Sequence, residues 1–409
     1  MRSEEVAARI SALRDAGRAL RRRPFAETLD ALCGVLDAWS DARSPWREEL
    51  CAALPDATGF TPATVREGLS RALAHWNGEA LRRLVATELG PAPERARGFD
   101  CTAVLLAGSI PMPSLLSLLA PLVVRSPVFA KCASRDPVTA PLVARSIAAA
   151  DAGLGACIHT ARFRGGDADA VDALLRADCV VATGSDATVD DVAARVASGT
   201  RLVRHGHRLS LAAVGEAATR GEALAALAAD LALDVALWDQ LGCLSPVAVL
   251  VAGGPAGCDR VAEALAAALE AAEKRWPRGR VEPADAALFA NEAALAELRG
   301  AGVFSGRDRA WTVVREADAT PRPAPLHRFL RVLPVADEQG LLRAIDPWCA
   351  HLAAVAIAGF GTGRPALADA LLRRGASRVC APGELQAPPL DWRNDGHGVV
   401  ASLVRRAEE

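Results

Sequence analysis

From about residue 100 onward, short apolar runs alternate with helical patterns, and this alternation constrains the fold more than any other feature. The first apolar runs, each bounded by turn or charged residues, lie at 102–107, 127–130, 178–182 and 247–251. Helical patterns separate them, for example at 136–150 and at 186–197. Such alternation predicts a largely parallel sheet with helices on both faces, the α/β class.

A second set of alternating elements follows: an apolar run at 329–335, a helix near 337–346, the run "HLAAVAIAGFG" and a helix from about Pro365. The first 95 residues differ, because their patterns are helical. Thr61-Pro62 suits an N-cap and first helical position, after which Val65 and Leu69 fall on one face. A helical N-terminal region is therefore expected before the α/β part.

Length and charge narrow the classes of function. A chain of 409 residues suggests two or three domains, and a net charge of −2 offers no field for nucleic acid or acidic lipid. The uncharged stretch 103–124 is long enough to suggest a membrane span, but Gly108, Pro111 and Pro113 interrupt it. A buried strand, a tight loop and a buried helix are expected there, and no membrane contact.

Ten cysteines are scattered without a CxxC motif or a Cys/His pair at zinc spacing. This usage predicts reduced thiols in the cytoplasm and no metal site. The opening "MRSEEVAARI" carries two glutamates and no apolar core, so no signal peptide is expected.

Two single residues are candidates for chemistry. Cys243 lies in "DQLGCLSP", where it is either a small core residue or a nucleophile; the neighbouring Gly242 permits the close backbone approach that covalent chemistry needs. Lys131 ends the apolar strand "SPVFAK", and the carboxyl end of a parallel strand is where ligands bind in open sheets. A solvated strand end is the plain alternative for Lys131.

Two glycine segments allow a phosphate site or a simple turn. Gly184 and Ser185 join a buried strand to a helix, where backbone N–H groups and the helix dipole can hold an anion or Ser185 can act only as N-cap. The segment "IAGFGTGRP" has Arg364 where G-x-G-x-x-G needs glycine, so a glycine turn is expected.

Seven segments in order carry a resemblance to a known family: "LLAGSIPMPSLLSLL", "FAKCASRDP", "VVATGSDATV", "RHGHRLSLAAVG", "DVALWDQLGCLSP", "HLAAVAIAG" and "GASRVCAPGELQAPPLDWRNDGHGVV". The series resembles the fatty acyl-CoA reductases typified by the reductase subunit of bacterial luciferase systems, within the aldehyde dehydrogenase superfamily. The resemblance runs from "HWNGEALRRLVATELG" (75–90) almost to the C-terminus, and "DQLGCLSP" and "PPLDWRNDG" are its most specific parts.

The resemblance implies roles for individual residues. Cys243 matches the cysteine that attacks a thioester carbonyl and forms an acyl-enzyme, which is then reduced to an aldehyde. Lys131 matches the lysine that holds the adenosine ribose of the cofactor. Gly184 and Ser185 match the turn that faces its pyrophosphate.

Two absent carboxylates refine the expectation. Hydrolytic aldehyde dehydrogenases carry a glutamate base in "ELGG", but the matching segment here is "SLAAVG" (210–215), which fits reduction. The position three residues after the ribose lysine, often glutamate in the superfamily, is Ser134 here, followed by Arg135. Removing a carboxylate and adding a cation makes room for a 2′-phosphate, so the expected cofactor is NADPH.

One departure concerns the oxyanion. The family has asparagine after the glycine of its "G-N-x-P" loop, whereas this chain has Ser109 in "GSIP". A serine hydroxyl can donate, but the shorter side chain reaches less far, and losing an oxyanion donor costs about 10²–10³ in rate. His207 matches the histidine of the family's "GHK/R" segment and receives no role.

The resemblance therefore implies an aldehyde-dehydrogenase-like α/β fold with an active-site cleft between two domains. The expected organisation is a helical N-terminal region (1–98), an NADP(H)-binding Rossmann-type domain (99–235), a catalytic domain (236–385) and a C-terminal tail (386–409). The expected activity is NADPH-dependent reduction of a fatty acyl thioester, acyl-CoA or carrier- or enzyme-bound, to the aldehyde.

Two alternatives remain open: a non-catalytic subunit of an acyl-reducing complex, and an aldehyde dehydrogenase or acyl-phosphate reductase on the same fold. An acyl-activating or acyl-transferring partner protein and a homo-oligomer are also expected.

Overall fold

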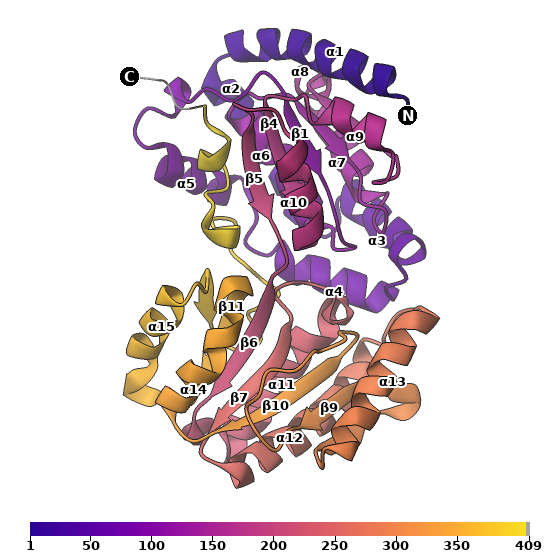
Figure 1. The fold of residues 1–409 in the computed structure, drawn as a ribbon. Coiled ribbons are helices and arrows are strands. Elements are labelled where there is room, and N and C mark those ends of the chain that lie inside the picture. Colours follow the sequence, from indigo (N-terminus) through magenta and orange to yellow (C-terminus); the bar gives the residue numbers. More distant parts are fainter. Residues whose placement is uncertain (406–409) are drawn as a thin grey trace. The chain divides into compact units, whose positions relative to one another are not determined.

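The computed structural model describes residues 1–405, which form two compact units. The first comprises Met1–Thr58, Ala72–His207 and the C-terminal segment from Pro389; the second comprises Gly59–Arg71 and Arg208–Pro388. Figure 1 shows the ribbon, in which each unit has its own twisted sheet flanked by helices.

The first unit is built on a five-stranded parallel sheet of order β3-β2-β1-β4-β5. Its strands are β1 (Thr102–Leu105), β2 (Val128–Lys131), β3 (Ile158–Ala161), β4 (Cys179–Thr183) and β5 (Arg201–His205). The order is Rossmann-type, because the chain runs outward from β1 to β3 and then returns to the other side of β1.

Helices cover both faces of this sheet (Figure 1). They are α1 (Ser3–Arg22), α2 (Phe25–Ser40), α3 (Pro45–Thr58), α5 (Gly78–Leu89), α6 (Met112–Val123), α7 (Thr139–Ala150), α8 (Ala152–Gly155), α9 (Ala168–Leu174) and α10 (Asp186–Arg195), with short 3₁₀ turns η1 (Pro93–Arg95), η7 (Asn394–Gly396) and η8 (Ala401–Leu403). Val6, Ile10 and Leu13 of α1 repeat on one helix face and pack on the sheet core with Phe129 and Val180.

The second unit is built on a seven-stranded sheet of order β12-β11-β6-β7-β10-β9-β8, in which only the β8–β9 pair is antiparallel. Its strands are β6 (Leu209–Val214), β7 (Pro246–Ala252), β8 (Gly302–Ser305), β9 (Thr312–Arg315), β10 (Phe329–Val335), β11 (Leu352–Ala358) and β12 (Arg378–Cys380). The central strands are buried and rich in Val, Leu and Ala, as parallel strands covered on both faces must be.

The helices of the second unit lie on both faces of its sheet. They are α4 (Pro62–Ala72, whose last residue is assigned to the first unit), α11 (Gly221–Ala236), α12 (Pro255–Arg275), α13 (Pro283–Leu298), α14 (Glu338–Ile345) and α15 (Arg364–Arg373), with 3₁₀ turns η2 (Glu216–Ala218), η3 (Leu237–Gln240), η4 (Arg307–Arg309), η5 (Asp346–His351) and η6 (Gly361–Gly363). Leu341 of α14 and Leu367 of α15 pack on the strand side chains Leu250 and Leu333.

The expected α/β fold class is confirmed, with parallel sheets and helical N-terminal residues. The stretch 103–124 forms β1, a loop and the buried helix α6, as expected. None of the helices within residues 1–405 combines the length and the apolar character that crossing a membrane requires.

The two units divide the chain differently from the expected four domains. The boundary at His207/Arg208 precedes the expected one at 235/236, because β6 pairs with β7 and β11 in the second sheet and α11 packs on α12. The C-terminal segment from Pro389 and the first 58 residues both join the unit of the five-stranded sheet instead of standing apart. Residues 406–409 of the expected tail lie outside the described residues.

Candidate functional site

Cys243 lies in the second unit, on the loop that leads into β7, and its side chain is exposed. Seven of the other nine cysteines are buried and two are half-buried. Burial raises the pKa of the Cys258 and Cys380 thiols to about 12, which makes them inert. Among the cysteines, all of which lie in the described part of the chain, Cys243 is thus the most exposed.

The backbone around this thiol is held by buried polar groups. The Ser210 hydroxyl donates to the Cys243 carbonyl at 2.7 Å, and the Ser245 N–H donates to the Gly242 carbonyl at 3.0 Å. Gln386 donates through Nε2 to the Ser245 hydroxyl at 3.0 Å. Ser210, Ser245 and Gln386 are all buried, so an exposed side chain stands on a fixed loop.

A left-handed turn precedes the loop. Trp238, Asp239 and Gln240 have φ angles of 55°, 50° and 63°, a region that side-chain-bearing residues rarely occupy. The Gln240 amide holds the turn in place: Nε2 donates to the carbonyls of Pro246 (2.8 Å) and Phe329 (3.0 Å), and Oε1 accepts from the Phe329 N–H at 2.8 Å. These hydrogen bonds hold the backbone of the turn in a strained conformation, and such strained backbone is often found at functional sites.

A buried ion network supports the same turn. Arg328, 1% exposed, donates to the Asp239 carboxylate at 2.6 and 3.0 Å and to Glu273 at 2.6 Å. Asp239 also accepts from the Gly279 N–H at 3.0 Å. Because both carboxylates share one guanidinium, removing Arg328 would leave buried negative charge without a partner.

Asp234, on α11, is a second buried carboxylate near the loop. Its oxygens accept from the backbone N–H groups of Gly383 (2.7 Å) and Leu385 (3.1 Å). Burial raises the pKa of Asp234 to about 7, against the opposing effect of these hydrogen bonds. The side chain therefore ties the segment after β12 to α11.

In the first unit, the remaining candidates gather at the carboxyl edge of the sheet. Ser109 follows β1, Lys131 ends β2 and Gly184 follows β4, and these three strands are neighbours. The order of strands reverses between β1 and β4, which is the topological switch point where open α/β sheets bind ligands.

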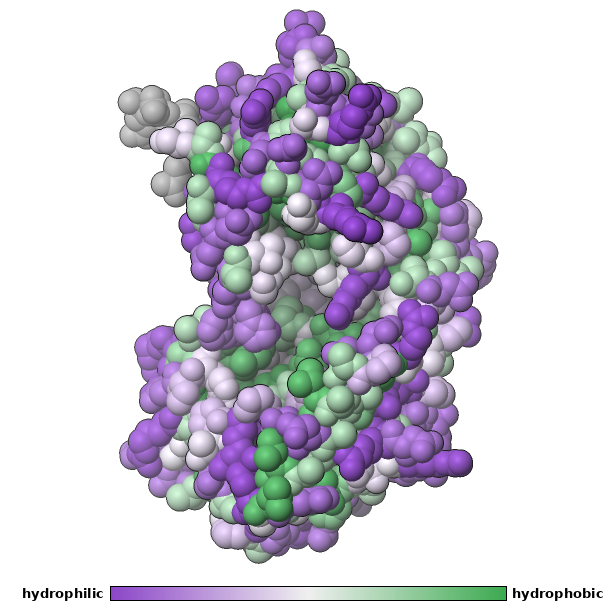
Figure 2. Space-filling model, turned by 45° about the vertical axis from the view of Figure 1, so that its right-hand side comes forward, coloured by the Kyte–Doolittle hydropathy of each residue, from purple (hydrophilic) through white to green (hydrophobic). Residues whose placement is uncertain are grey.

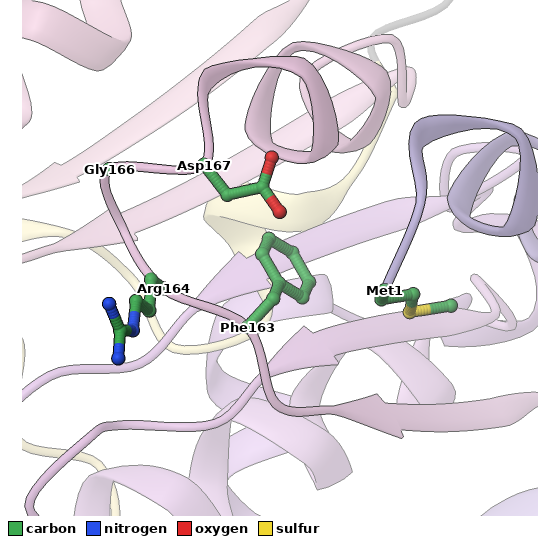
Figure 3. Close-up of a pocket in the computed structure, with 5 residues that line it drawn as sticks. All are labelled: Met1, Phe163, Arg164, Gly166 and Asp167. Atoms are coloured by element: carbon green, nitrogen blue, oxygen red, sulfur yellow. The ribbon is translucent and has the colours of Figure 1, made fainter.

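Lys131 is only 8% exposed and makes no ion pair within residues 1–405. Its ammonium lies 5.6 Å from the centre of the Phe163 ring, and burial lowers its pKa. Phe163 also lines a pocket of about 590 Å³ with Met1, Asp167 and Arg164. Figure 3 shows the ring turned toward Asp167 and the Arg164 side chain directed away from it.

Cations collect on the loops that follow β2 and β3. Ser134 and Arg135 are exposed, and Arg135 makes no ion pair within the described residues. Ala161, the last residue of β3, pairs with Lys131, so Arg162 and Arg164 follow at the same edge. Sequence reasoning missed these two arginines, because the short polar strand β3 carried no apolar signal; the "ARFRGG" run of cations and glycines was the available one.

Gly184 and Ser185 join β4 to α10, as expected. A Cβ on Gly184 would meet the Thr188 side chain at 3.1 Å, so this position is tight. Ser185 caps α10, accepting from the Thr188 N–H at 3.3 Å. Asp186, in the first turn, accepts from the His207 N–H at 2.8 Å, which gives the segment around His207 a structural link to the turn.

A dyad that the sequence did not suggest lies beside this turn. His205 ends β5, its carbonyl accepts from the Gly184 N–H at 3.1 Å, and its ring lies 2.7 Å through Nδ1 from Asp395. Asp395 belongs to the "RNDG" segment, whose tertiary partner could not be read from the chain. The C-terminal segment thus stabilises the strand end next to Gly184.

Ser109 is 5% exposed and follows Gly108, which has a φ of 84°. Its hydroxyl makes no hydrogen bond within residues 1–405, and α6 begins at Met112 without a side-chain cap. Ser109 therefore does not cap the following turn. Ser109 belongs to the first unit and Cys243 to the second.

The glycine segment after β11 is a packing turn, as expected. A Cβ on Gly359 would meet the Gly215 carbonyl oxygen at 2.6 Å, and one on Gly215 would meet the Gly359 oxygen at 2.2 Å. The two strand ends of β6 and β11 approach as closely as only glycine permits.

Solved structures similar to the chain share the aldehyde dehydrogenase fold. An NAD-dependent benzaldehyde dehydrogenase from Corynebacterium glutamicum has a TM-score of 0.75 at 17% identity, covering 99% of this chain and 88% of that one. An NADP-dependent glyceraldehyde-3-phosphate dehydrogenase from Bacillus halodurans C-125, complexed with NADP, has a TM-score of 0.76 at 15% identity (98% and 90%). Aldehyde dehydrogenase 21 from Physcomitrella patens has a TM-score of 0.76 at 14% identity (99% and 90%).

At these identities the likeness establishes the fold. No protein of curated function matches the sequence. The sequence model of one family, however, matches residues 21–406, nearly the whole chain. Together with the anchored, exposed cysteine and the Rossmann-type sheet, this match shows that the chain belongs to the acyl-CoA reductase (LuxC) family, oxidoreductases that act on an acyl group.

Proposed function

We propose that the protein reduces a fatty acyl thioester to the aldehyde with NADPH, through an acyl-enzyme on Cys243. The observation that carries this proposal is the contrast between one exposed thiol on a fixed loop and nine less accessible cysteines. Covalent catalysis needs a nucleophile that is accessible and held in one place. The chain has a single cysteine that meets both conditions.

The residues at the carboxyl edge of the first sheet fit a dinucleotide. Lys131 has a buried ammonium without an ion pair, which suits a ribose hydroxyl. Arg135, with Arg162 and Arg164 nearby, suits a 2′-phosphate. The Gly184–Ser185 turn presents the N-terminus of α10 to a pyrophosphate. Asp186, the one acidic group in that first turn, accepts from the His207 N–H. Position 134 holds an exposed serine, whereas a carboxylate at this position would repel a 2′-phosphate.

The chemistry then follows from this chain's own groups. The Cys243 thiolate attacks the thioester carbonyl, the departing thiol takes up a proton, and a new thioester joins the acyl group to Sγ. When bound, NADPH supplies the hydride that reduces this acyl group. Hydride addition would leave an oxyanion on the carbon attached to Sγ; as this oxygen re-forms the C=O bond the C–S bond breaks, the aldehyde leaves, and the Cys243 thiolate is regenerated.

Two features of the chain bear on the charged steps. Ser109 is proposed as the side-chain donor to the oxyanion, on the resemblance and on its unengaged hydroxyl. Ser210, the residue that begins the "SLAAVG" segment, donates to the Cys243 carbonyl and offers no carboxylate to activate water. Because this position holds no carboxylate, water is not activated there and the acyl-enzyme lasts long enough to be reduced, which favours a reductase over a hydrolytic aldehyde dehydrogenase.

A steady-state assay tests the proposal. With an acyl-CoA and NADPH, Cys243→Ala should lower aldehyde formation by at least about 10³-fold. The matched control is Cys349→Ala, a change at a half-buried cysteine on η5, which should leave turnover intact. Wild-type turnover in Cys243→Ala would refute the proposal.

A further inference from the structure

Six arginines line one cavity at the amino edge of the five-stranded sheet, within the first unit. The cavity has a volume of about 620 Å³, inside the range of about 300–1,000 Å³ that is typical of small-molecule sites. Hydrophilic side chains cover much of the visible surface of the first unit in Figure 2, so exposed arginines alone mark no site. These six differ because they line the same cavity. They are Arg18, Arg21, Arg22, Arg95, Arg97 and Arg125.

Two glycines bring the walls of this cavity together. A Cβ on Gly17 of α1 would meet the Pro127 side chain at 2.5 Å, so glycine lets the helix lie against the segment before β2. A Cβ on Gly98 would meet the Val124 carbonyl oxygen at 2.5 Å, and the Gly98 N–H donates to that oxygen at 2.8 Å. The end of α1, the segment before β1 and the turn after α6 therefore meet at one place, and each contributes arginines.

Arg125 holds one wall of the cavity in place. It has a φ angle of 60°, and its Nη2 donates to the carbonyls of Glu94 at 2.6 Å and Ala96 at 2.8 Å. Its Nε is buried without an acceptor among residues 1–405. Burial first, and then the charge of nearby Arg97, lower the pKa of Arg125, against the opposing effect of Glu94. Positive charge is therefore crowded here, and Arg125 forms no ion pair within the described residues to relieve it.

Three carboxylates balance part of this charge. Asp15 pairs with Arg18 at 2.6 Å, and Asp100 pairs with Arg21 at 3.1 Å. Glu94 is the acidic residue among those that line the cavity. Six guanidinium groups are thus set against three carboxylates, which leaves an excess of three positive charges.

Arg22, Arg95 and Arg97 are exposed, and they make no ion pair within the part of the chain that the structure describes. The plain explanation for Arg22 is that cations are favourable in the last turn of a helix, here α1. That explanation does not extend to Arg97, which lies in no helix. The ends of α1 and α6 also offer only about half a negative charge each, which is less than the excess.

We propose that this cavity binds a small anion that carries two phosphate groups. Guanidinium groups form paired hydrogen bonds with phosphate oxygens, and one phosphate group brings a charge of about −1.5 to −2, so two match the excess of three. The cavity is separate from the proposed dinucleotide site of Lys131 and Gly184, because that site lies at the other end of strands about 13 Å long. The proposal does not depend on the reaction at Cys243.

Isothermal titration of the full chain with inorganic pyrophosphate tests the proposal. The wild type should bind, and the double variant Arg22→Ala/Arg97→Ala should bind at least about 30-fold more weakly. Arg9→Ala removes another exposed cation of α1 that makes no ion pair among residues 1–405, and it should bind as the wild type does. Arg135→Ala/Arg164→Ala removes cations at the carboxyl edge and should keep this binding. The proposal fails if the wild type does not bind, if Arg22→Ala/Arg97→Ala binds equally well, or if Arg135→Ala/Arg164→Ala abolishes binding.

Thermal melts supply a second readout. Each variant should melt near the wild type without ligand, which shows that it is folded. Pyrophosphate should raise the Tm of the wild type and of Arg9→Ala, but not that of Arg22→Ala/Arg97→Ala. Sulfate at equal ionic strength should raise the Tm less, and an equal rise would contradict a site for two phosphate groups. Co-sedimentation with phosphatidylglycerol vesicles distinguishes a lipid headgroup from a free anion. Binding to vesicles without binding to pyrophosphate would overturn the proposal.

Discussion

The loop of Cys243 and the carboxyl edge of the five-stranded sheet use charged and polar groups in opposite ways. Around Cys243, polar side chains are buried and paired: Gln240 makes three hydrogen bonds and Arg328 joins two carboxylates. At the sheet edge, Lys131 and Arg135 are cations without ion pairs among residues 1–405.

The difference matches what each region is proposed to do. A nucleophile must be held at one position, so its supports satisfy one another and fix the backbone. A dinucleotide brings its own negative charge, so the groups that receive it gain more if they are not already paired. The proposed reaction therefore needs rigidity in one unit and unsatisfied charge in the other.

The largest effect is expected from a substitution that disrupts the paired polar groups around Cys243. Arg328→Met should lower the free energy of unfolding by about 3–5 kcal/mol, because Asp239 and Glu273 lose their buried partner. Arg135→Met, which removes an exposed cation without an ion pair, should change it by less than about 0.5 kcal/mol. Urea unfolding of both variants measures these changes. Similar losses of unfolding free energy in the two variants would contradict the proposed difference between the two regions.

Substitutions of Ser109 test the difference between the two regions by their effect on catalysis. Ser109→Ala should lower kcat about 10²-fold with little change in KM, since the hydroxyl would act only as charge develops on the oxygen. Its thermal stability should stay near that of the wild type, because the hydroxyl makes no hydrogen bond among the described residues. Ser109→Asn, with a longer donor, should raise kcat. Unchanged kcat in both variants would remove Ser109 from the active site.

The carboxyl edge of the five-stranded sheet, where the cations make no ion pairs among residues 1–405, is tested by the preference for NADPH over NADH. Ser134→Glu should lower kcat/KM for NADPH about tenfold more than for NADH, because a carboxylate would face the 2′-phosphate. Ser134→Gln, of equal length and no charge, is the control and should shift the preference little. If Ser134→Glu lowers kcat/KM equally for NADPH and NADH, the residue at position 134 does not contribute to recognition of the ribose 2′ position.

A pH-dependent effect is expected from Asp234. Its pKa is raised by burial to about 7, so between the unfolded value of about 3.9 and pH 7 the folded state binds more protons than the unfolded state. The free energy of unfolding should therefore fall as pH rises through this window, by up to about 1.4 kcal/mol per unit. Asp234→Asn, always neutral, should lack that slope in urea titrations. Parallel pH profiles of the two proteins would show that Asp234 stays ionised.

The sequence predicted most of the buried strands, but it missed the buried strand β6 and the edge strands β3 and β5. β1, β2, β4, β7, β10 and β11 are short apolar runs, and such runs indicate buried strands directly. β3 and β5 were missed because edge strands such as Arg201–His205 are short and carry little apolar signal: in β5 only Val203 is buried. The sequence pattern singled out Cys243 and Gly184, the resemblance supplied their expected roles, and both residues lie next to strand ends in the structure.

The supports of the loop could not be predicted from the chain. Gln240 and Phe329, Asp239 and Arg328, and Ser210 and Cys243 are paired across 89, 89 and 33 residues, and no local pattern specifies such distant partners. The dyad of His205 and Asp395, 190 residues apart, is of the same kind. Local propensity places elements; it does not reveal which buried polar groups will satisfy one another.

The central claim is that Cys243 carries the acyl group, and trapping the acyl-enzyme tests it directly. The protein is incubated with an acyl-CoA in the absence of NADPH, digested and mapped by mass spectrometry. The account predicts the mass of one acyl group on the peptide that contains Cys243 and none in Cys243→Ala. An acyl group on any other cysteine, or no acyl group on the wild-type protein, would contradict it.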